Sequence, residues 1–191
     1  LRSEKENPLP KKAVLFTGSS SIRKWETLAA DMAPIPVINR GFGGSTLRQV
    51  HHYAPKIILP HQPRQIVLNA GENDIANTVY DAEVAVEDFD SLVTYLQYHL
   101  PETPILYLTM KPSPARWAYW PKFQAANAAI AEMCAEDPLV RYIEVSEVML
   151  NAEGAPLNDI WVRDQLHMNA KGYAAWTDLI RPHVEEMAQM Q

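Results

Sequence analysis

An aspartate and a histidine three residues apart, Asp164 and His167, could together form an oriented general base. On a helical turn, side chains with this spacing lie on the same face, so the carboxylate could accept a hydrogen bond from one ring nitrogen. That bond would fix the tautomer of the imidazole and leave its second nitrogen free to take a proton. A surface aspartate in a helix-capping contact is the alternative interpretation of the same pair.

Three consecutive serines, Ser19–Ser21, follow Gly18 at the end of an apolar run. We expect a helix to begin there, so the hydroxyl of Ser20 would lie near free backbone N–H groups and the positive end of the helix dipole. Both favour a nucleophile and the oxyanion that it produces. N-capping and turn formation are the structural roles open to these serines. Ile22 occupies the place of the last glycine in a G-x-S-x-G motif, and the lack of that glycine weighs against an α/β-hydrolase.

Two further blocks could supply hydrogen-bond donors to an oxyanion. Gly43 and Gly44 carry no Cβ, so a backbone N–H there could approach a ligand closely. Their spacing does not match the G-x-G-x-x-G dinucleotide fingerprint. The side-chain amide of Asn73 could donate in the same way. A tight turn at the glycines and an Asx turn at Asn73 are the structural alternatives.

Together these blocks resemble the SGNH hydrolases, also called GDSL-type lipases and esterases, in a bacterial form. The resemblance extends from about Ala13 to the C-terminal helix, because four blocks match in order. Ser19 stands where the first block of the family usually has aspartate, and a serine can also cap a helix and bond to backbone. The matching blocks are Gly18-Ser19-Ser20, Asn39 to Ser45, Gly71-Glu72-Asn73-Asp74 and Asp164 to His167.

The resemblance implies a serine esterase that works through an acyl-enzyme and needs no cofactor. In that scheme Ser20 is the nucleophile, His167 is the general base and Asp164 orients it. The oxyanion would be bound by the backbone N–H groups of Ser20 and Gly44 and by the amide of Asn73. A carbohydrate deacetylase or an acyltransferase could use the same site, and a binding protein could keep the fold without turnover.

The substrate is expected to be a small-molecule ester with a small or short acyl group. No long apolar insertion interrupts the pattern, and the one obvious apolar wall is a proline-rich loop with Trp117, Tyr119 and Trp120. Trp117 and Arg116 are therefore candidates for substrate binding, with packing as the alternative for the aromatic residues. Arg23 and Arg40, like Arg116, could bind an acidic substrate, and a solvated or structural role is the alternative for each.

Five apolar runs bounded by breakers predict the strands that must position these residues. Helical periodicity between the runs predicts a three-layer α/β/α sandwich with a five-stranded parallel sheet, where functional groups collect at the carboxyl ends of the strands. The resemblance adds a flavodoxin-like strand order, 2-1-3-4-5. The predicted strands are 13–17, 36–39, 65–69, 104–109 and 140–145, and the predicted helices lie within 85–100, 123–133 and 173–187, with shorter ones over 22–32 and 46–53.

The length of 191 residues fits one domain over residues 13–191, preceded by a polar N-terminal arm over 1–12. A net charge of −6 argues against a nucleic-acid binder. No apolar run approaches the length of about 18 residues that a transmembrane helix needs. The first residue is not methionine, so we expect a processed or shortened N-terminus. Periplasmic, secreted and cytoplasmic locations stay open, as does the oligomeric state.

No metal is expected. The one cysteine, Cys134, excludes an internal disulfide framework and a cysteine-based zinc cluster, and its place on the apolar side of a helix predicts an inert core residue. The adjacent pair His51 and His52 would point about 100° apart on a helix, so the two rings could not easily share one ion.

Overall fold

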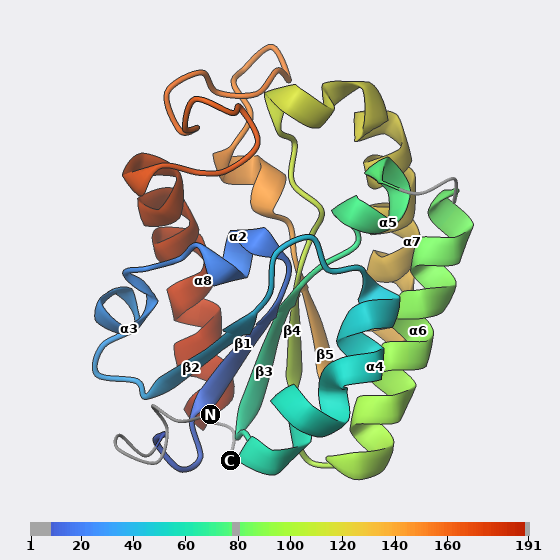
Figure 1. Ribbon diagram of the computed structural model, residues 1–191, viewed down its shortest axis with the longest axis vertical. Coiled ribbons are helices and arrows are strands. Elements are labelled where there is room, and N and C mark those ends of the chain that lie inside the picture. Colours follow the sequence, from blue (N-terminus) through green and yellow to red (C-terminus); the bar gives the residue numbers. More distant parts are fainter. Residues whose placement is uncertain (1–8, 78–80, 190–191) are drawn as a thin grey trace.

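The computed structural model describes residues 9–77 and 81–189, so residues 1–8 of the predicted arm lie outside the described residues. Five parallel strands form one sheet in the order β2-β1-β3-β4-β5 (Figure 1). This confirms the predicted α/β fold and the strand order that the resemblance implied. The strands are β1 (Val14–Gly18), β2 (Val37–Gly41), β3 (Gln65–Asn69), β4 (Ile105–Leu108) and β5 (Val140–Ile143).

Both faces of the sheet are covered, because successive side chains of the central strands enter two different hydrophobic layers. Leu15 of β1 packs into one layer, whereas its neighbours Val14 and Phe16 pack into the other. The same alternation continues in β3, where Ile66 belongs to the first layer and Val67 to the second. Strands buried on both faces read as continuous apolar runs, which is why the sequence pattern located them.

Three long helices cover the first face of the sheet, and the C-terminal helix covers the second together with two short ones (Figure 1). On the first face lie α4 (Leu47–Ile57), α6 (Ala82–His99) and α7 (Trp120–Glu136). On the second lie α2 (Ser20–Arg23), α3 (Leu28–Asp31) and α8 (Ala170–Gln189). The remaining short elements are α5 (Glu72–Ala76), η1 (Leu59–His61), η2 (Pro114–Tyr119) and η3 (Val145–Val148).

The short helix predicted over 22–32 is instead two separate turns of helix, α2 and α3. Trp25 lies between them, fully buried against Phe16 and Trp176. Packing of this ring therefore interrupts a helix that periodicity alone would have continued. In the described part of the chain, none of the helices combines the length and apolar character required to cross a membrane.

Candidate active site

The loops that carry the sequence blocks begin at the same edge of the sheet. Gly18 at the end of β1 is in register with Gly41 of β2 and with Asn69 of β3. The backbone N–H of Phe42 donates to the carbonyl of Gly18 over 2.9 Å, which joins the second loop to the first. The carboxyl ends of three adjacent strands therefore bring the serine, glycine and asparagine blocks together (Figure 1).

The turn between β1 and α2 needs a glycine. Gly18 has a φ of +128°, and a Cβ at this position would lie 1.9 Å from the carbonyl oxygen of Asn69. The next N–H, that of Ser19, donates to the same oxygen over 2.9 Å. This tight contact with β3 lets α2 begin directly at Ser20, the position at which the sequence analysis expected a helix to start.

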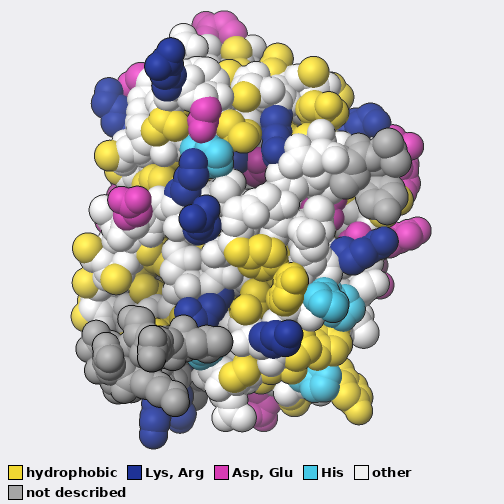
Figure 2. Space-filling view, in the orientation of Figure 1, with side chains coloured by type: hydrophobic (Ala, Val, Ile, Leu, Met, Phe, Trp, Pro, Cys, Tyr) yellow, Lys and Arg dark blue, Asp and Glu magenta, His cyan; other side chains and the backbone are white. Residues whose placement is uncertain are grey.

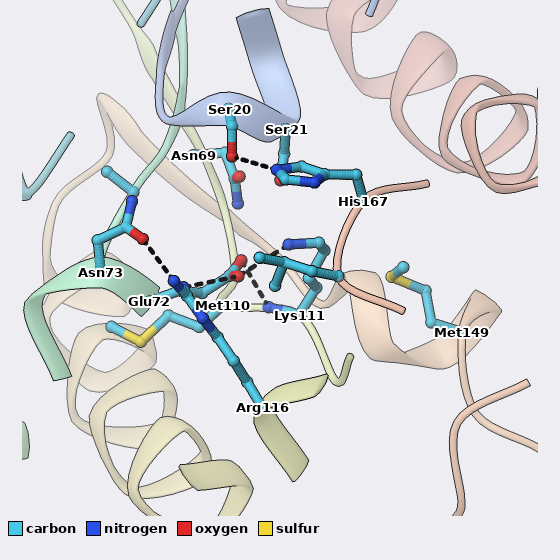
Figure 3. A network of polar contacts seen from close by, with 12 residues as sticks. Ser20, Ser21, Asn69, Glu72, Asn73, Met110, Lys111, Arg116, Met149 and His167 are labelled. Carbon is cyan, nitrogen blue, oxygen red and sulfur yellow. Dashed lines mark hydrogen bonds and ion pairs between the residues drawn. The ribbon is translucent and has the colours of Figure 1, made fainter. Parts of the chain in front are cut away.

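Ser20, His167 and Asp164 form a chain of two hydrogen bonds. The Oγ atom of Ser20 lies 2.9 Å from Nε2 of His167 (Figure 3). The Nδ1 atom of His167 lies 2.6 Å from Oδ2 of Asp164. With its Nδ1 proton directed to the carboxylate, the imidazole presents Nε2 as an acceptor for the serine hydroxyl. Such an arrangement can deprotonate a nucleophile and later return the proton to a leaving group.

The expectation that a helical turn pairs Asp164 with His167 is wrong. Both residues lie in the loop before α8, which begins only at Ala170. The Oδ1 atom of Asp164 accepts the backbone N–H groups of Leu166 and His167, each over 2.9 Å. Gln165, which lies between Asp164 and His167, has a φ of +56°. A turn closed by the aspartate side chain thus produces the contact that the spacing suggested.

Asp164 is held as a carboxylate. Desolvation raises its pKa, but the hydrogen bond from the ring of His167 and those from two backbone N–H groups outweigh this, and the pKa lies well below its usual range. The carboxylate therefore stays ionised across the neutral and mildly acidic range and can stabilise a positive charge on the neighbouring imidazole.

Two backbone N–H groups near the serine lack a protein acceptor within the described residues. One belongs to Ser20, at the first position of α2, where no intrahelical acceptor exists. The other belongs to Gly44, whose φ of +75° favours glycine and where nothing lies within 4 Å of a built Cβ. Unpaired donors of this kind can bind an oxyanion.

Asn73 is attached to the glycine block by its side chain. Its Nδ2 atom donates to the carbonyl of Ser45 over 2.9 Å, directly after Gly44. The next residue, Asp74, accepts the backbone N–H of Leu47 at the start of α4 with both carboxylate oxygens, at 3.0 and 3.2 Å. The α5 segment therefore fixes both the glycine loop and the helix that follows it. Burial raises the pKa of Asp74 to about 6.

A buried ionic network lies beneath these groups (Figure 3). The ammonium of Lys111 is 2.8 Å from Oε2 of Glu72, and the two side chains are only 2% and 5% exposed. The guanidinium of Arg116 lies 3.9 Å from the same oxygen. The sequence patterns assigned no role to Glu72 or Lys111, although a charged residue three positions after each of the buried strands β3 and β4 was a usable signal.

The aromatic side chains of η2 are partly buried. Trp117 is 38% exposed and stacks on the buried Trp120, with ring centroids 5.9 Å apart. Tyr119 stacks on Phe123 in the same way, at 6.4 Å. One face of each of Trp117 and Tyr119 thus packs on a buried ring.

The other singled-out residues divide between structural and solvent-facing positions. Arg40 donates to Nε2 of His61 over 3.0 Å, which favours a structural role. Arg23 is exposed, with its guanidinium beside Gly43. Cys134 is buried in α7, and desolvation raises the pKa of its thiol to about 11, in keeping with an inert residue. Among the residues that the structure describes, no three His, Cys, Asp or Glu side chains gather as metal ligands would.

His167 also borders a cavity of about 580 Å³ on the side of α3 and α8. Lys24, Asp31 and Tyr173 line it, but Ser20 does not, so the cavity lies behind the imidazole rather than in front of the serine hydroxyl. On the face of the molecule that Figure 2 shows, a histidine side chain reaches the surface in the upper part, with basic and acidic side chains close by.

The C-terminal helix is tied to the serine segment. The hydroxyl of Tyr173 donates to the backbone carbonyl of Ser21 over 2.9 Å, and its ring stacks on Trp25 with centroids 5.4 Å apart. The first turn of α8 thereby fixes α2 beside the loop that carries His167 (Figure 1).

Comparison with known proteins gives a consistent result. The model of the GDSL-like lipase/acylhydrolase family matches residues 11–175. A GDSL-like lipase from Bacteroides thetaiotaomicron has a TM-score of 0.81 at 21% identity, with 97% of this chain and 95% of that chain covered. A lipase/acylhydrolase from Enterococcus faecalis has a TM-score of 0.71 at 16% identity, with 92% and 96% covered.

An acetylxylan esterase from Geobacillus stearothermophilus, solved as a catalytic mutant, has a TM-score of 0.71 at 13% identity, with 90% of this chain and 94% of that chain covered. At such identities the three structures show a common fold. A search of the curated proteins finds no match.

Proposed function

Because the chain belongs to the GDSL-like lipase/acylhydrolase family, we propose that it is a serine esterase that hydrolyses small carboxylic esters through an acyl-enzyme. The hydrogen-bonded chain from Ser20 through His167 to Asp164 carries this proposal. A nucleophile, a base within hydrogen-bond reach and a group that orients the base are the parts that acyl transfer requires.

In the first half of the reaction, Nε2 of His167 takes the hydroxyl proton as the Oγ atom of Ser20 attacks the ester carbonyl carbon. The carbonyl oxygen becomes an oxyanion, and the N–H groups of Ser20 and Gly44 and the amide of Asn73 bind it. As the C–O bond to the alcohol breaks, the imidazolium returns its proton to the leaving oxygen. Asp164 stabilises the imidazolium throughout.

In the second half, water takes the place of the alcohol. His167 removes a proton from the water as its oxygen attacks the acyl carbon, and the bond to Ser20 Oγ breaks with return of that proton to the serine. The products are the free acid and the regenerated enzyme, and no cofactor enters the balance.

A carbohydrate acetyl ester is the second candidate substrate. The similarity in fold to an acetylxylan esterase favours it, and the chemistry at Ser20 would be the same. Activity on acetylated sugars compared with simple p-nitrophenyl esters separates the two candidates. An acyltransferase would instead show product in which a sugar or alcohol acceptor replaces water.

The test of the proposal is the variant Ser20→Ala compared with Ser21→Ala. Wild type should react with a fluorophosphonate probe and hydrolyse p-nitrophenyl acetate. Ser20→Ala should lose the labelling and on the order of 10⁴ or more in kcat. Ser21→Ala is the matched control, because its buried Oγ has no hydrogen-bond partner in the described part of the chain.

Full activity in Ser20→Ala would refute the proposal. Absence of both labelling and turnover in a folded wild type would favour a binding protein. Labelling without turnover of simple esters would direct the search to carbohydrate esters.

A further inference from the structure

The carboxamide of Asn73 has its orientation fixed by partners on both ends. Its Oδ1 atom accepts from Nη2 of Arg116 over 2.8 Å and from Nδ2 of Asn77 over 3.1 Å. Its Nδ2 atom donates to the carbonyl of Ser45. A flipped amide would direct Nδ2 at the guanidinium and Oδ1 at a carbonyl oxygen, so only one orientation satisfies all partners. The second N–H of Nδ2 has no protein acceptor among the described residues.

The guanidinium of Arg116 is itself held in place. Its Nη2 atom also donates to Oδ1 of Asn77 over 3.2 Å, and its side chain is only 13% exposed. The Arg116 side chain thus joins the loop after β4 to α5 and its C-cap residue Asn77, in addition to the link that Lys111 makes with Glu72 (Figure 3).

The positive charge of Arg116 is only partly neutralised by Glu72. That carboxylate already binds the ammonium of Lys111 at 2.8 Å and the backbone N–H of the same lysine at 3.2 Å. Two cationic side chains thus share one buried carboxylate, and the closer of the two is Lys111. Glu72 can therefore neutralise at most one of the two cations, and the guanidinium of Arg116 is the one in direct contact with Asn73.

We propose that Arg116 is a positioning residue that orients and polarises the Asn73 carboxamide for oxyanion binding. The proposal rests on the role of Asn73 in the proposed function. A cation on Oδ1 draws electron density from the amide and makes the free N–H of Nδ2 a stronger donor. Its charge also attracts the oxyanion at short range, and its side chain is largely shielded from solvent.

This role differs from direct substrate binding in its kinetic effect. Negative charge on the carbonyl oxygen develops only in the transition state, so loss of Arg116 should lower kcat and leave KM nearly unchanged. If Arg116 instead contacted an acidic group of the substrate, its loss should raise KM at constant kcat.

The experiment is a double-mutant cycle of Arg116→Met and Asn73→Ala, measured with p-nitrophenyl acetate, a neutral substrate. Asn73→Ala should lose about 10²–10³ in kcat. Arg116→Met should lose about 10- to 100-fold, the range for one charge-assisted hydrogen bond. In the Asn73→Ala background the same arginine substitution should change kcat by less than about threefold, because the residue through which it acts is absent.

Arg181→Met is the matched control. Arg181 also bridges protein oxygens, the carbonyls of Asp31 and Ala33, but it does so on α8 rather than in the site. Its loss should lower thermal stability without lowering kcat. Arg116→Lys keeps the charge but lacks the planar fork, in which Nη2 reaches Asn73 and Asn77 while Nη1 faces Glu72, so it should recover part of the lost kcat.

Additive losses from Arg116→Met and Asn73→Ala would overturn the proposal, as would a raised KM at constant kcat in Arg116→Met. Should Arg116→Met not fold, a kcat for Arg116→Lys equal to that of wild type would overturn it, and a kcat lowered by threefold or more at constant KM would support it. A fully active Asn73→Ala variant would instead refute the role of Asn73, and with it the proposed oxyanion site, whatever Arg116 does.

Discussion

The imidazole of His167 depends on one carboxylate for its tautomer. Asp164→Asn should therefore fold normally and lose about 10⁴ in kcat, because an amide no longer selects the Nδ1–H form. In wild type Asp164 stays ionised across the neutral and mildly acidic range because its hydrogen bonds keep its pKa low, so protonation of this carboxylate should not limit the rate there. Steady-state kinetics on p-nitrophenyl acetate measure kcat for both proteins.

Asp159→Asn is the control for that substitution. Asp159 is an exposed carboxylate in the same loop region and pairs with Lys171 at 2.9 Å, away from Ser20. It should retain the activity of wild type. A fully active Asp164→Asn variant would contradict a histidine base that this carboxylate orients.

At the scale of an element, Asp74 connects α5 to the start of α4. Because burial raises its pKa from 3.8 to about 6, the folded state holds this proton to a higher pH than the unfolded chain does. The contribution of Asp74 to stability is therefore fully present below about pH 3.8 and is lost as the pH rises from there through about 6. The full contribution is roughly 3 kcal/mol.

Asp74→Asn removes this dependence and keeps an oxygen that can accept the Leu47 N–H. The free energy of unfolding of wild type minus that of Asp74→Asn should fall by up to about 3 kcal/mol between pH 4 and pH 7. Urea denaturation at a series of pH values measures the difference, in which groups common to both proteins cancel. A difference that is constant or that grows with pH would contradict the raised pKa.

The η2 segment holds the aromatic side chains that we expect to contact the acyl group. Burial of each CH₂ of an acyl chain is worth about 0.8 kcal/mol, so an apolar wall of limited size favours short chains. Trp117→Ala should alter the preference between acetyl and hexanoyl p-nitrophenyl esters more than it alters turnover of the acetate. Tyr98→Ala, which removes a ring that is 82% exposed on α6, is the control. A rate in wild type that climbs through palmitate would show a long acyl groove instead.

Most elements could be predicted from the sequence because their signal is a burial pattern. β3 matches its predicted bounds, and the other strands differ by two residues or fewer at each end. The α5 helix was not predicted, since three of its four buried residues are polar. Hydrophobic periodicity contains no information on such an element, whose side chains are buried to make hydrogen bonds.

The candidate site was predictable in its residue types but not in its contacts. The spacing of Asp164 and His167 suggested a helix, whereas the hydrogen bonds of the aspartate side chain close a turn. The partners of Asn73 were not predictable, because Arg116 follows a different strand and reaches it only through the tertiary fold. Long-range polar contacts of this kind leave no period in a single sequence.

At the scale of the whole molecule, the site depends on both hydrophobic layers of one sheet. The α2 segment rests on the layer that contains Trp25 and α8, whereas α5 rests on the layer that contains α6 and α7. We propose that residues 13–191 act as one domain for this reason. Displacement of either layer would separate Ser20 from Asn73, although neither residue belongs to a hydrophobic core.

The hydrogen bond between Tyr173 and Ser21 joins the first turn of α8 to α2, and this long-range contact has a consequence for folding. Ser20 and His167 are 147 residues apart in the sequence, so closing the loop between them costs entropy that few local contacts can offset. We therefore expect catalytic competence to appear only once the first turn of α8 has docked on α2. The same docking brings Trp25 and Trp176 together, with ring centroids 6.0 Å apart. In refolding, turnover should not precede burial of these two rings, and a chain that lacks its final helix should be inactive.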